Sequence, residues 1–306
     1  MRNTVIIFEG ANFLGCVLIE KLLQSGYNVI AIDSLPHAEQ EYFARFKDVP
    51  EFSCAMSIPD VKEGEVRAVY YFGLQLCHAR NKVFFLQMLD LNNSLARKAI
   101  TLAEKTNAVY VGLSLRDTSR IPGIASCRYM LFPEAWQKAT VYAEALARQS
   151  RESNGTDVRL LRIFNCYGKN MEKYCTSTIT QFIKNALAGN PLRVFDGGED
   201  THAFTFADDV AELLLQLPDS DAKQLLNVMG EESLSLAELA RKIIALCKGG
   251  ELVSLASDSQ EETEELSPDL SYSRPIVGRF LTTSLDDGLA KTIASFKNSS
   301  IHCPLE

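Results

Sequence analysis

The chain has 306 residues, 46% of them hydrophobic, which is enough for a large core in one or two domains. The formal net charge is −8 and no run of lysines and arginines stands out, which argues against a nucleic-acid partner. No apolar run is long enough to span a bilayer, and no signal peptide precedes the first apolar run, so we expect a cytoplasmic protein without membrane contact.

The eight cysteines are scattered along the chain. None of them shows the CxxC or cysteine–histidine spacing of a zinc site. This distribution predicts reduced thiols and no bound metal.

Short apolar runs alternate with helical segments through the first half of the chain. A strand, a helix and a second strand of this length imply a right-handed crossover and a parallel sheet. The pattern therefore predicts an α/β fold with a Rossmann-type, doubly wound sheet. The expected strands are Thr4–Gly10, Tyr27–Asp33, Phe52–Ile58, Ala68–Leu74, Ala108–Ser114 and Val158–Asn165, and the expected helices are Phe13–Gly26, Phe84–Lys105 and Glu134–Ser150.

The texture changes after Gly168, where helices begin with clear capping signals. Ser235 with Glu238, and Ser284 with Asp287, have the spacing of capping boxes. We expect a smaller C-terminal α+β domain for the substrate, formed by residues 169–202 and 230–306. The dinucleotide-binding domain would then comprise residues 1–168 and 203–229.

The first crossover carries residues typical of dinucleotide binding. Glycine in the turn lets the backbone approach a pyrophosphate at the helix N-terminus, and an acid closing the second strand takes the ribose hydroxyls. Gly10 ends the first strand, and Asp33 follows it by 23 residues. An aspartate after a strand is also common as a turn residue or helix cap. Asp33 indicates a ribose ligand only together with the surrounding strand–helix–strand unit.

Four segments of the second half carry a resemblance that extends over nearly the whole chain. The chain is similar to the extended short-chain dehydrogenase/reductases (extended SDR), in the branch of NAD-dependent nucleotide-sugar epimerases and dehydratases. The segments, each close to a block of that family and in the same order, are LRIFNCYG (161–168), AFTFADDVAELLL (203–215), LNVMG (226–230) and VGRFLTTSLDDGLAKTI (277–293).

The resemblance implies an NAD site, with Asp33 favouring NAD over NADP. It also implies that this site has changed: Glu9, Asn12 and Gly15 stand at the three glycines of the family's first turn, and Ser57 stands at its adenine-binding aspartate. We expect binding to be weakened or lost because of Glu9 and Asn12. The implied cofactor residues are Gly10, Asn12, Phe13, Leu14, Gly15, Asp33, Ser34, Gly73 and Asn92.

The resemblance places the family's catalytic serine at Ser114, and its tyrosine and lysine at Trp136 and Thr140. In the family the lysine lowers the pKa of the tyrosine so that the phenol can exchange protons near neutrality. Tryptophan exchanges no proton and threonine carries no charge. No tyrosine of the chain is followed by a lysine four residues later, so a shifted alignment does not recover the pair.

The resemblance implies a partly retained substrate half, with Asn165 beside a sugar-nucleotide diphosphate, and with Arg193 and His202 as substrate-binding residues. An acidic stretch at residues 258–269 lies where the family has a substrate-closing arginine, and Arg274 is the nearest replacement. Asn165 and Arg162 could equally satisfy buried backbone groups.

Two functions remain open. One is a pseudoenzyme with this fold that binds a ligand or acts as a scaffold without the usual catalysis. The other is an active epimerase, dehydratase or reductase that uses different proton-transfer residues, for instance Tyr129 or Tyr142. We favour the first, because the turn and the Tyr/Lys pair have changed together. The resemblance further implies a homodimer through helices 84–105 and 136–150.

Overall fold

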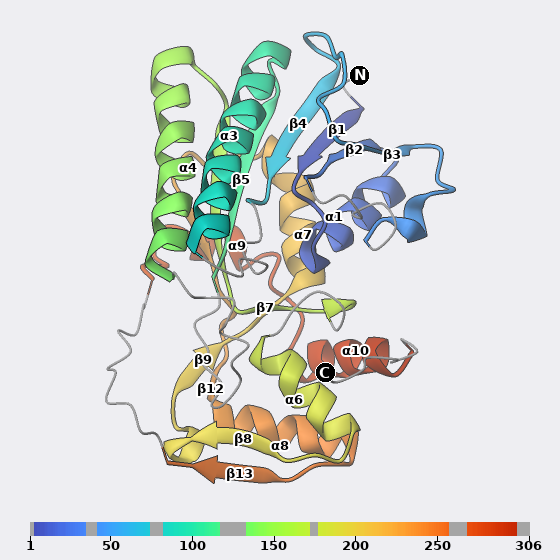
Figure 1. Cartoon of the computed structure of the whole chain (residues 1–306), viewed down its shortest axis with the longest axis vertical. Coiled ribbons are helices and arrows are strands. Elements are labelled where there is room, and N and C mark those ends of the chain that lie inside the picture. The colour runs from blue at the N-terminus through green and yellow to red at the C-terminus, as the bar shows by residue number, and fades with distance from the viewer. Residues whose placement is uncertain are drawn as a thin grey trace. The chain divides into compact units, whose positions relative to one another are not determined.

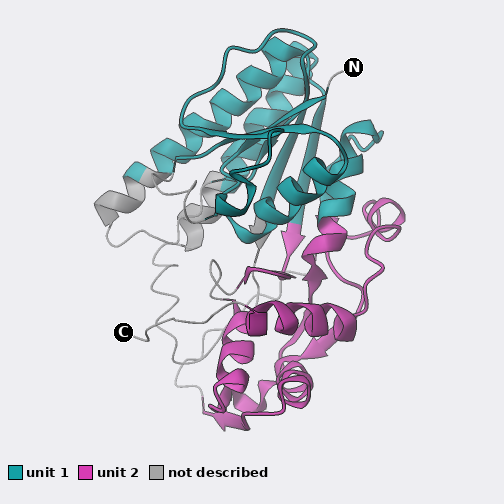
Figure 2. Ribbon diagram, turned by 90° about the vertical axis from the view of Figure 1, so that its right-hand side faces the viewer, with its two compact units in different colours: residues 1–115, 126–162, 211–226 teal, residues 116–125, 163–210, 227–306 magenta. Residues whose placement is uncertain are grey.

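A computed structural model describes residues 3–34, 42–73, 82–116, 133–171, 177–256 and 268–298. The chain divides into two compact units (Figure 2). The first contains residues 1–115, 126–162 and 211–226, and the second contains residues 116–125, 163–210 and 227–306. The predicted domain boundaries, at residues 168, 202 and 229, stay a prediction.

The central element is a seven-stranded sheet, which confirms the expected α/β, Rossmann-type fold (Figure 1). Its strand order is β11-β6-β5-β4-β1-β2-β3, and the pairs from β5 through β3 are parallel. Chain connections that leave the middle of the sheet in opposite directions define a doubly wound fold. The strands are β1 (Thr4–Phe8), β2 (Asn28–Ile32), β3 (Phe52–Ala55), β4 (Val66–Tyr71), β5 (Val109–Arg116), β6 (Val158–Phe164) and β11 (Leu226–Val228).

Helices cover both faces of this sheet because its strands are apolar on both sides. Tyr71 of β4 lies in a buried cluster with Ala96 and Ala147, whereas the hydroxyl of the preceding Tyr70 donates to the carbonyl oxygen of Leu214 at 2.7 Å. Successive strand residues point to opposite faces, so these contacts assign helices to each face. The helices are α1 (Phe13–Gln24), α3 (Lys82–Thr106), α4 (Pro133–Asn154) and α7 (Ala207–Gln216).

The helices of each face also contact one another. Lys21 of α1 and Glu212 of α7 form an ion pair at 2.5 Å. On the other face α3 and α4 lie side by side (Figure 1), and Ser150 donates to Glu104 at 2.6 Å. The expected helices at 84–105 and 136–150 are therefore present.

The second unit combines short strand pairs with helices, as expected for a small α+β region. The predicted Ser235 capping box is present, because the Ser235 and Glu238 side chains bond reciprocally to each other's backbone amides. At the second predicted box, Ser284 Oγ accepts from Asp287 N at 3.2 Å and donates to Asp287 Oδ2 at 2.8 Å. The strand pairs are β7 (Cys166–Tyr167) with β10 (Thr205–Phe206), β9 (Thr201–Ala203) with β12 (Ser233–Ser235), and β8 (Leu192–Phe195) with β13 (Leu252–Leu255). The helices are α6 (Thr178–Leu187), α8 (Leu236–Cys247), α9 (Arg274–Val277) and α10 (Leu285–Asn298).

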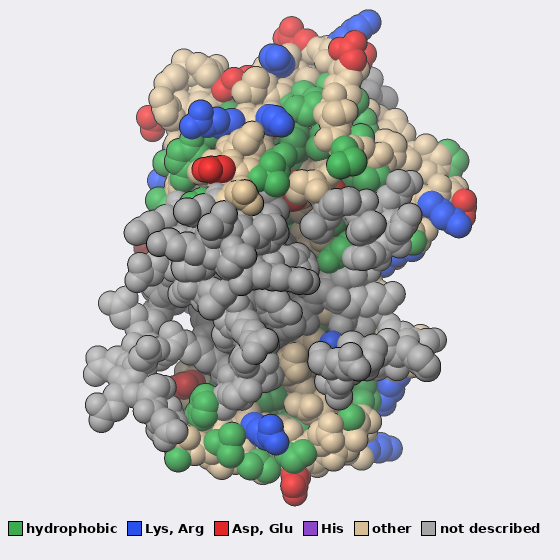
Figure 3. Space-filling model, viewed as in Figure 1, with side chains coloured by type: hydrophobic (Ala, Val, Ile, Leu, Met, Phe, Trp, Pro, Cys, Tyr) green, Lys and Arg blue, Asp and Glu red, His purple; other side chains and the backbone are tan. Residues whose placement is uncertain are grey.

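The described surface carries charges of both signs. On the face shown in Figure 3, basic and acidic side chains are interspersed rather than gathered into a basic patch. Within the described ranges, no helix is long and apolar enough to cross a membrane.

Candidate functional site

The turn between β1 and α1 is held by Asn12, which stands at a position where the resemblance implies a glycine. Asn12 caps α1: its side-chain oxygen accepts from Gly15 N at 2.8 Å, and its amide donates to the carbonyl oxygen of Glu9 at 3.0 Å. Phe13 and Leu14 follow it as buried residues of the first helical turn. Asparagine at this position therefore stabilises the turn rather than disturbing it.

Glu9 ends β1 with a φ of 56°, a left-handed conformation that favours glycine. Its side chain is buried, and the residue is only 5% exposed. The carboxylate does not extend along the turn towards the helix N-terminus. It accepts from Ser34 N at 3.1 Å and from Ser34 Oγ at 2.9 Å, immediately after β2.

Asp33 is buried beside Glu9 at the end of β2, and its carboxylate accepts from Ala11 N at 2.8 Å. Burial raises the pKa of Glu9 from 4.5 to about 8; the charge of Asp33 adds to this effect, and the bonds from Ser34 oppose it. Two carboxyl groups in one buried site disfavour double ionisation, which favours a pair that retains one proton.

Part of this turn fits a dinucleotide and part does not. Gly15 lets α1 approach the turn closely, because an added Cβ would collide with the carbonyl oxygen of Gly10. Asp33 stands where a ribose would be bound. However, Ser34 is already hydrogen-bonded to Glu9. In this conformation the two Ser34 donors are taken by Glu9 and are not available to a bound ribose.

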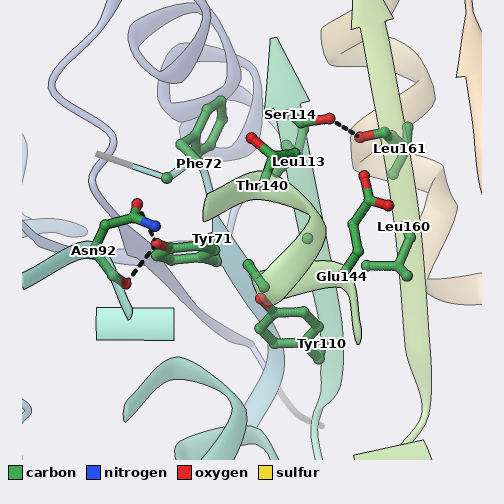
Figure 4. Close-up of a pocket in the computed structure, with 13 residues that line it drawn as sticks. Tyr71, Phe72, Asn92, Tyr110, Leu113, Ser114, Thr140, Glu144, Leu160 and Leu161 are labelled. Atoms are coloured by element: carbon green, nitrogen blue, oxygen red, sulfur yellow. Dashed lines mark hydrogen bonds between the residues drawn. The ribbon is translucent and has the colours of Figure 1, made fainter. Parts of the chain in front are cut away.

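A second group of predicted residues lines a small cavity at the carboxyl ends of β4 and β5, with a volume of about 20 Å³ (Figure 4). Tyr71 and Asn92 lie at one side, where the Tyr71 hydroxyl donates to Asn92 Oδ1 at 2.7 Å. Gly73 lies beside Asn92 with a φ of 74°. A cavity of this size holds about one water molecule.

Ser114 and Thr140 line this cavity together, as the resemblance implies for the serine and lysine positions. Ser114 Oγ donates to the carbonyl oxygen of Leu161 at 3.5 Å. Trp136 lies four residues before Thr140 in α4, and its side chain is outside the described part. Within the described part of the chain, the lining of this cavity contains no lysine, arginine or histidine.

The two tyrosines of the cavity lie in an environment that disfavours the charged phenolate. Burial raises the pKa of Tyr71 well above 10, and burial also raises the pKa of Tyr110. A general acid or base works best when its pKa is near the working pH. Burial therefore moves these pKa values away from the working pH, and the described lining carries no cation that would lower them.

Glu144, the acid inside the catalytic-helix region, forms a two-pronged ion pair with Arg162 of β6. Arg162 Nε donates to Glu144 Oε1 at 2.8 Å, and Arg162 Nη2 donates to Glu144 Oε2 at 2.6 Å. Arg162 of β6 therefore pairs with a carboxylate on α4. One expectation had been that it would satisfy a buried backbone group.

Of the tyrosines suggested as replacement acids, Tyr142 contacts α3. The Tyr142 hydroxyl accepts from Arg97 Nε of α3 at 2.9 Å, and the Arg97 guanidinium also stacks on its ring. Tyr129 lies outside the described residues.

The predicted substrate residues fall in the second unit. Asn165 has a φ of 43°, and its amide donates to the carbonyl oxygen of Ala203 at 2.9 Å, so it satisfies a buried backbone group as one expectation had it. His202 precedes Ala203 in β9, and Arg193 is exposed in β8. Arg274 is exposed at the start of α9, and residues 258–267 of the acidic stretch lie outside the described residues.

A family model matches most of the sequence. The model described as "NAD dependent epimerase/dehydratase family" matches residues 6–228, which is most of the chain. The protein belongs to the NAD-dependent epimerase/dehydratase family. The predicted resemblance is thereby confirmed.

Relatives within the family are distant but cover the whole chain. UDP-glucuronic acid decarboxylase 1 of Xenopus tropicalis is 25% identical over 98% of this chain and 74% of its own length. UDP-glucuronic acid decarboxylase 6 of Arabidopsis thaliana is 23% identical over 93% of this chain and 86% of its own length.

Solved structures share the fold of this epimerase/dehydratase chain. The Bordetella bronchiseptica enzyme WbmF in complex with NAD+ and UDP aligns with a TM-score of 0.74 and 22% identity, over 97% of this chain and 92% of that one. UDP-glucuronic acid 4-epimerase from Bacillus cereus, in complex with UDP-glucuronic acid and NAD, aligns with a TM-score of 0.74 and 18% identity, over 96% and 99%.

Sequence reasoning missed three interactions of this family member: Glu9 with Ser34, Tyr71 with Asn92, and Glu144 with Arg162. Each joins residues 18–25 positions apart on different elements. The only available signal was a charged or phenolic residue in an apolar segment, which indicates that a partner exists but not which one.

Proposed function

We propose that this protein binds a nucleotide sugar and does not carry out the hydride chemistry of its family. The observation that carries the proposal is Thr140 on the lining of the Ser114 cavity, at the position that the resemblance gives to lysine. A neutral side chain there leaves no cation to lower the pKa of a phenol. NAD, which related structures contain, would be bound weakly or not at all.

The proposed ligand is a UDP-linked sugar. It is suggested by the UDP-containing complexes of the related WbmF and UDP-glucuronic acid 4-epimerase. Arg193 is exposed on β8 and would pair with the diphosphate, because a charge-assisted contact with phosphate is stronger than a neutral hydrogen bond. Asn165 and His202 are the other proposed contacts.

The test combines binding with turnover. We expect calorimetry to detect UDP and UDP-glucuronic acid binding, and Arg193→Ala to weaken it about tenfold. Arg241→Ala, on the exposed side of α8, is the matched control and should leave affinity unchanged. We expect no change in the sugar, followed by mass spectrometry, when NAD is added.

The alternative function is an active enzyme that uses another proton-transfer group, with Tyr129 as the remaining suggested candidate. Conversion of UDP-glucuronic acid by the purified protein would contradict the proposal and establish that alternative. A Tyr129→Phe variant would then show whether the phenol takes part, because it loses only the hydroxyl.

The proposed assembly is a homodimer through α3 and α4. These helices expose apolar side chains, with Leu91 37% and Val141 51% exposed. A monomer by light scattering at micromolar concentration would contradict the dimer.

The proposed setting is the cytosol. The four cysteines within the described ranges are free thiols.

A further inference from the structure

The end of β1 carries a side chain where a ligand-binding turn needs open space. Glu9 keeps the strand pairing, because its backbone amide donates to the carbonyl oxygen of Ile32 at 2.8 Å. Its carbonyl oxygen accepts from the Asn12 amide, which fixes the left-handed backbone. The side chain is therefore held in one direction by its own turn.

That direction leads to the end of β2, the position from which ribose hydroxyls are recognised in this type of fold. Both donors of Ser34 bond to the Glu9 carboxyl group. The neighbouring carboxylate, Asp33, accepts from Ala11 N of the same turn. The contacts that a bound ribose would use are thus made within the chain.

We infer that Glu9 is an internal ligand of this turn, which takes the Ser34 contacts beside Asp33 and excludes a dinucleotide unless its side chain moves away. Its position makes it a specificity-determining residue, and the exclusion is linked to a proton because two carboxyl groups share the site. The inference rests on the proposed function, in which the turn serves no hydride transfer.

The ionisable groups around Glu9 lie in or beside β2, β4, α1 and the 3₁₀ turn Ala44–Phe46. Asp33 of β2 and the buried Tyr71 of β4 face it, and the charge of Glu9 contributes to the raised pKa of Tyr71. On α1, burial raises the pKa of the Cys16 thiol, and the charge of Asp33 adds to this effect. Arg45 donates to the Cys16 carbonyl oxygen at 2.8 Å. Raising the pH charges Glu9 and adds repulsion towards a pyrophosphate.

The experiment is a titration of the full-length chain with NAD at about pH 6.5 and about pH 9, using the wild type and Glu9→Gly. Glycine adopts a φ of 56° freely, so the variant should fold. We expect it to bind NAD at least about tenfold more tightly than the wild type at both pH values. Glu63→Gly, at an exposed position far along the chain, is the matched control and should behave as the wild type.

Proton linkage gives a second readout that requires no turnover. Wild-type affinity for NAD should fall about tenfold between the two pH values, whereas that of Glu9→Gly should change less than about threefold. The inference is overturned by a wild type that binds NAD at micromolar concentration with equal affinity at both pH values. A folded Glu9→Gly that binds no more tightly than the wild type also overturns it.

These outcomes are distinct from a failure of the proposed function. Micromolar, pH-independent NAD binding by the wild type without sugar conversion contradicts the role of Glu9 and leaves sugar binding without turnover intact. Sugar conversion contradicts the proposed function, whatever the variant does.

Discussion

The turn after β1 and the Ser114 cavity are both changed relative to the family pattern, but in opposite ways. At the turn, a glycine position has gained a carboxyl group that is buried and hydrogen-bonded to Ser34. At the cavity, a lysine position has become Thr140, and the space beside it is about 20 Å³. The first change adds a titratable group to the folded core, whereas the second removes one.

This difference teaches that two departures from a family pattern can have different physical signatures. Substitutions at the turn should change the pH dependence of stability, because they alter a buried charge. Substitutions of Ser114 or Thr140, which carry no ionisable group at these pH values, should leave that pH dependence unchanged. Four measurements follow, in order of the expected effect.

The largest effect concerns Glu9, whose folded pKa of about 8 lies above the ordinary value of 4.5. Between these values the folded chain keeps a proton that the unfolded chain has released, so stability falls as pH rises from about 4.5 to 8. We expect the wild type to lose up to about 5 kcal/mol more than Glu9→Gln across that window. Urea unfolding of both proteins at several pH values measures the difference, and parallel curves would contradict it.

The ion pair between Glu144 and Arg162 tests whether the cavity wall depends on charge. Arg162→Ala should lower the free energy of unfolding by about 3 kcal/mol, because it leaves the largely buried Glu144 carboxylate without its partner. Lys242→Ala breaks an exposed pair with Asp286 and should cost less than about 1 kcal/mol. Equal costs for the two variants would show that Glu144 is solvated.

Variants of Asn12 test how much its side-chain hydrogen bonds stabilise the turn. Asn12→Ala removes the cap on Gly15 N and the bond to the Glu9 carbonyl oxygen, so we expect a loss of about 1–2 kcal/mol in thermal or urea unfolding. Asn12→Ser keeps a capping oxygen and should recover most of the loss. A neutral Asn12→Ala variant would mean that α1 is held by its packing alone.

The smallest effect belongs to Ser114. Its bond to the Leu161 carbonyl oxygen is long, at 3.5 Å, so Ser114→Ala should change the free energy of unfolding by less than about 0.5 kcal/mol. UDP binding should also be unaffected, as judged by calorimetry. A tenfold loss of UDP affinity would show that this serine still orients a ligand.

The sequence predicted most of the fold because the fold follows local signals. Apolar runs bounded by glycine became β1, β2 and β4, and the Ser235–Glu238 box begins α8 as expected. These features depend on neighbours within a few positions, which periodicity and capping rules describe well.

The candidate site was only partly predictable, because its chemistry depends on distant partners. The sequence shows a glutamate, Glu9, at a position where the resemblance implies a glycine. It does not show where this side chain points, because its partner Ser34 lies 25 residues later. The same holds for Arg162, which meets an acid on α4 rather than a backbone group. A sequence pattern assigns a residue to a face of an element, whereas its rotamer and partner are set by tertiary packing.

Gly15 has a consequence for how variation in this protein would be read. Any side chain there would meet the backbone of Gly10, so its requirement comes from the junction of helix and turn and holds without any ligand. In a survey of all substitutions scored by protein abundance in cells, Gly15 should rank among the least tolerant positions. Its persistence would then report on folding yield, whether or not the turn binds a dinucleotide.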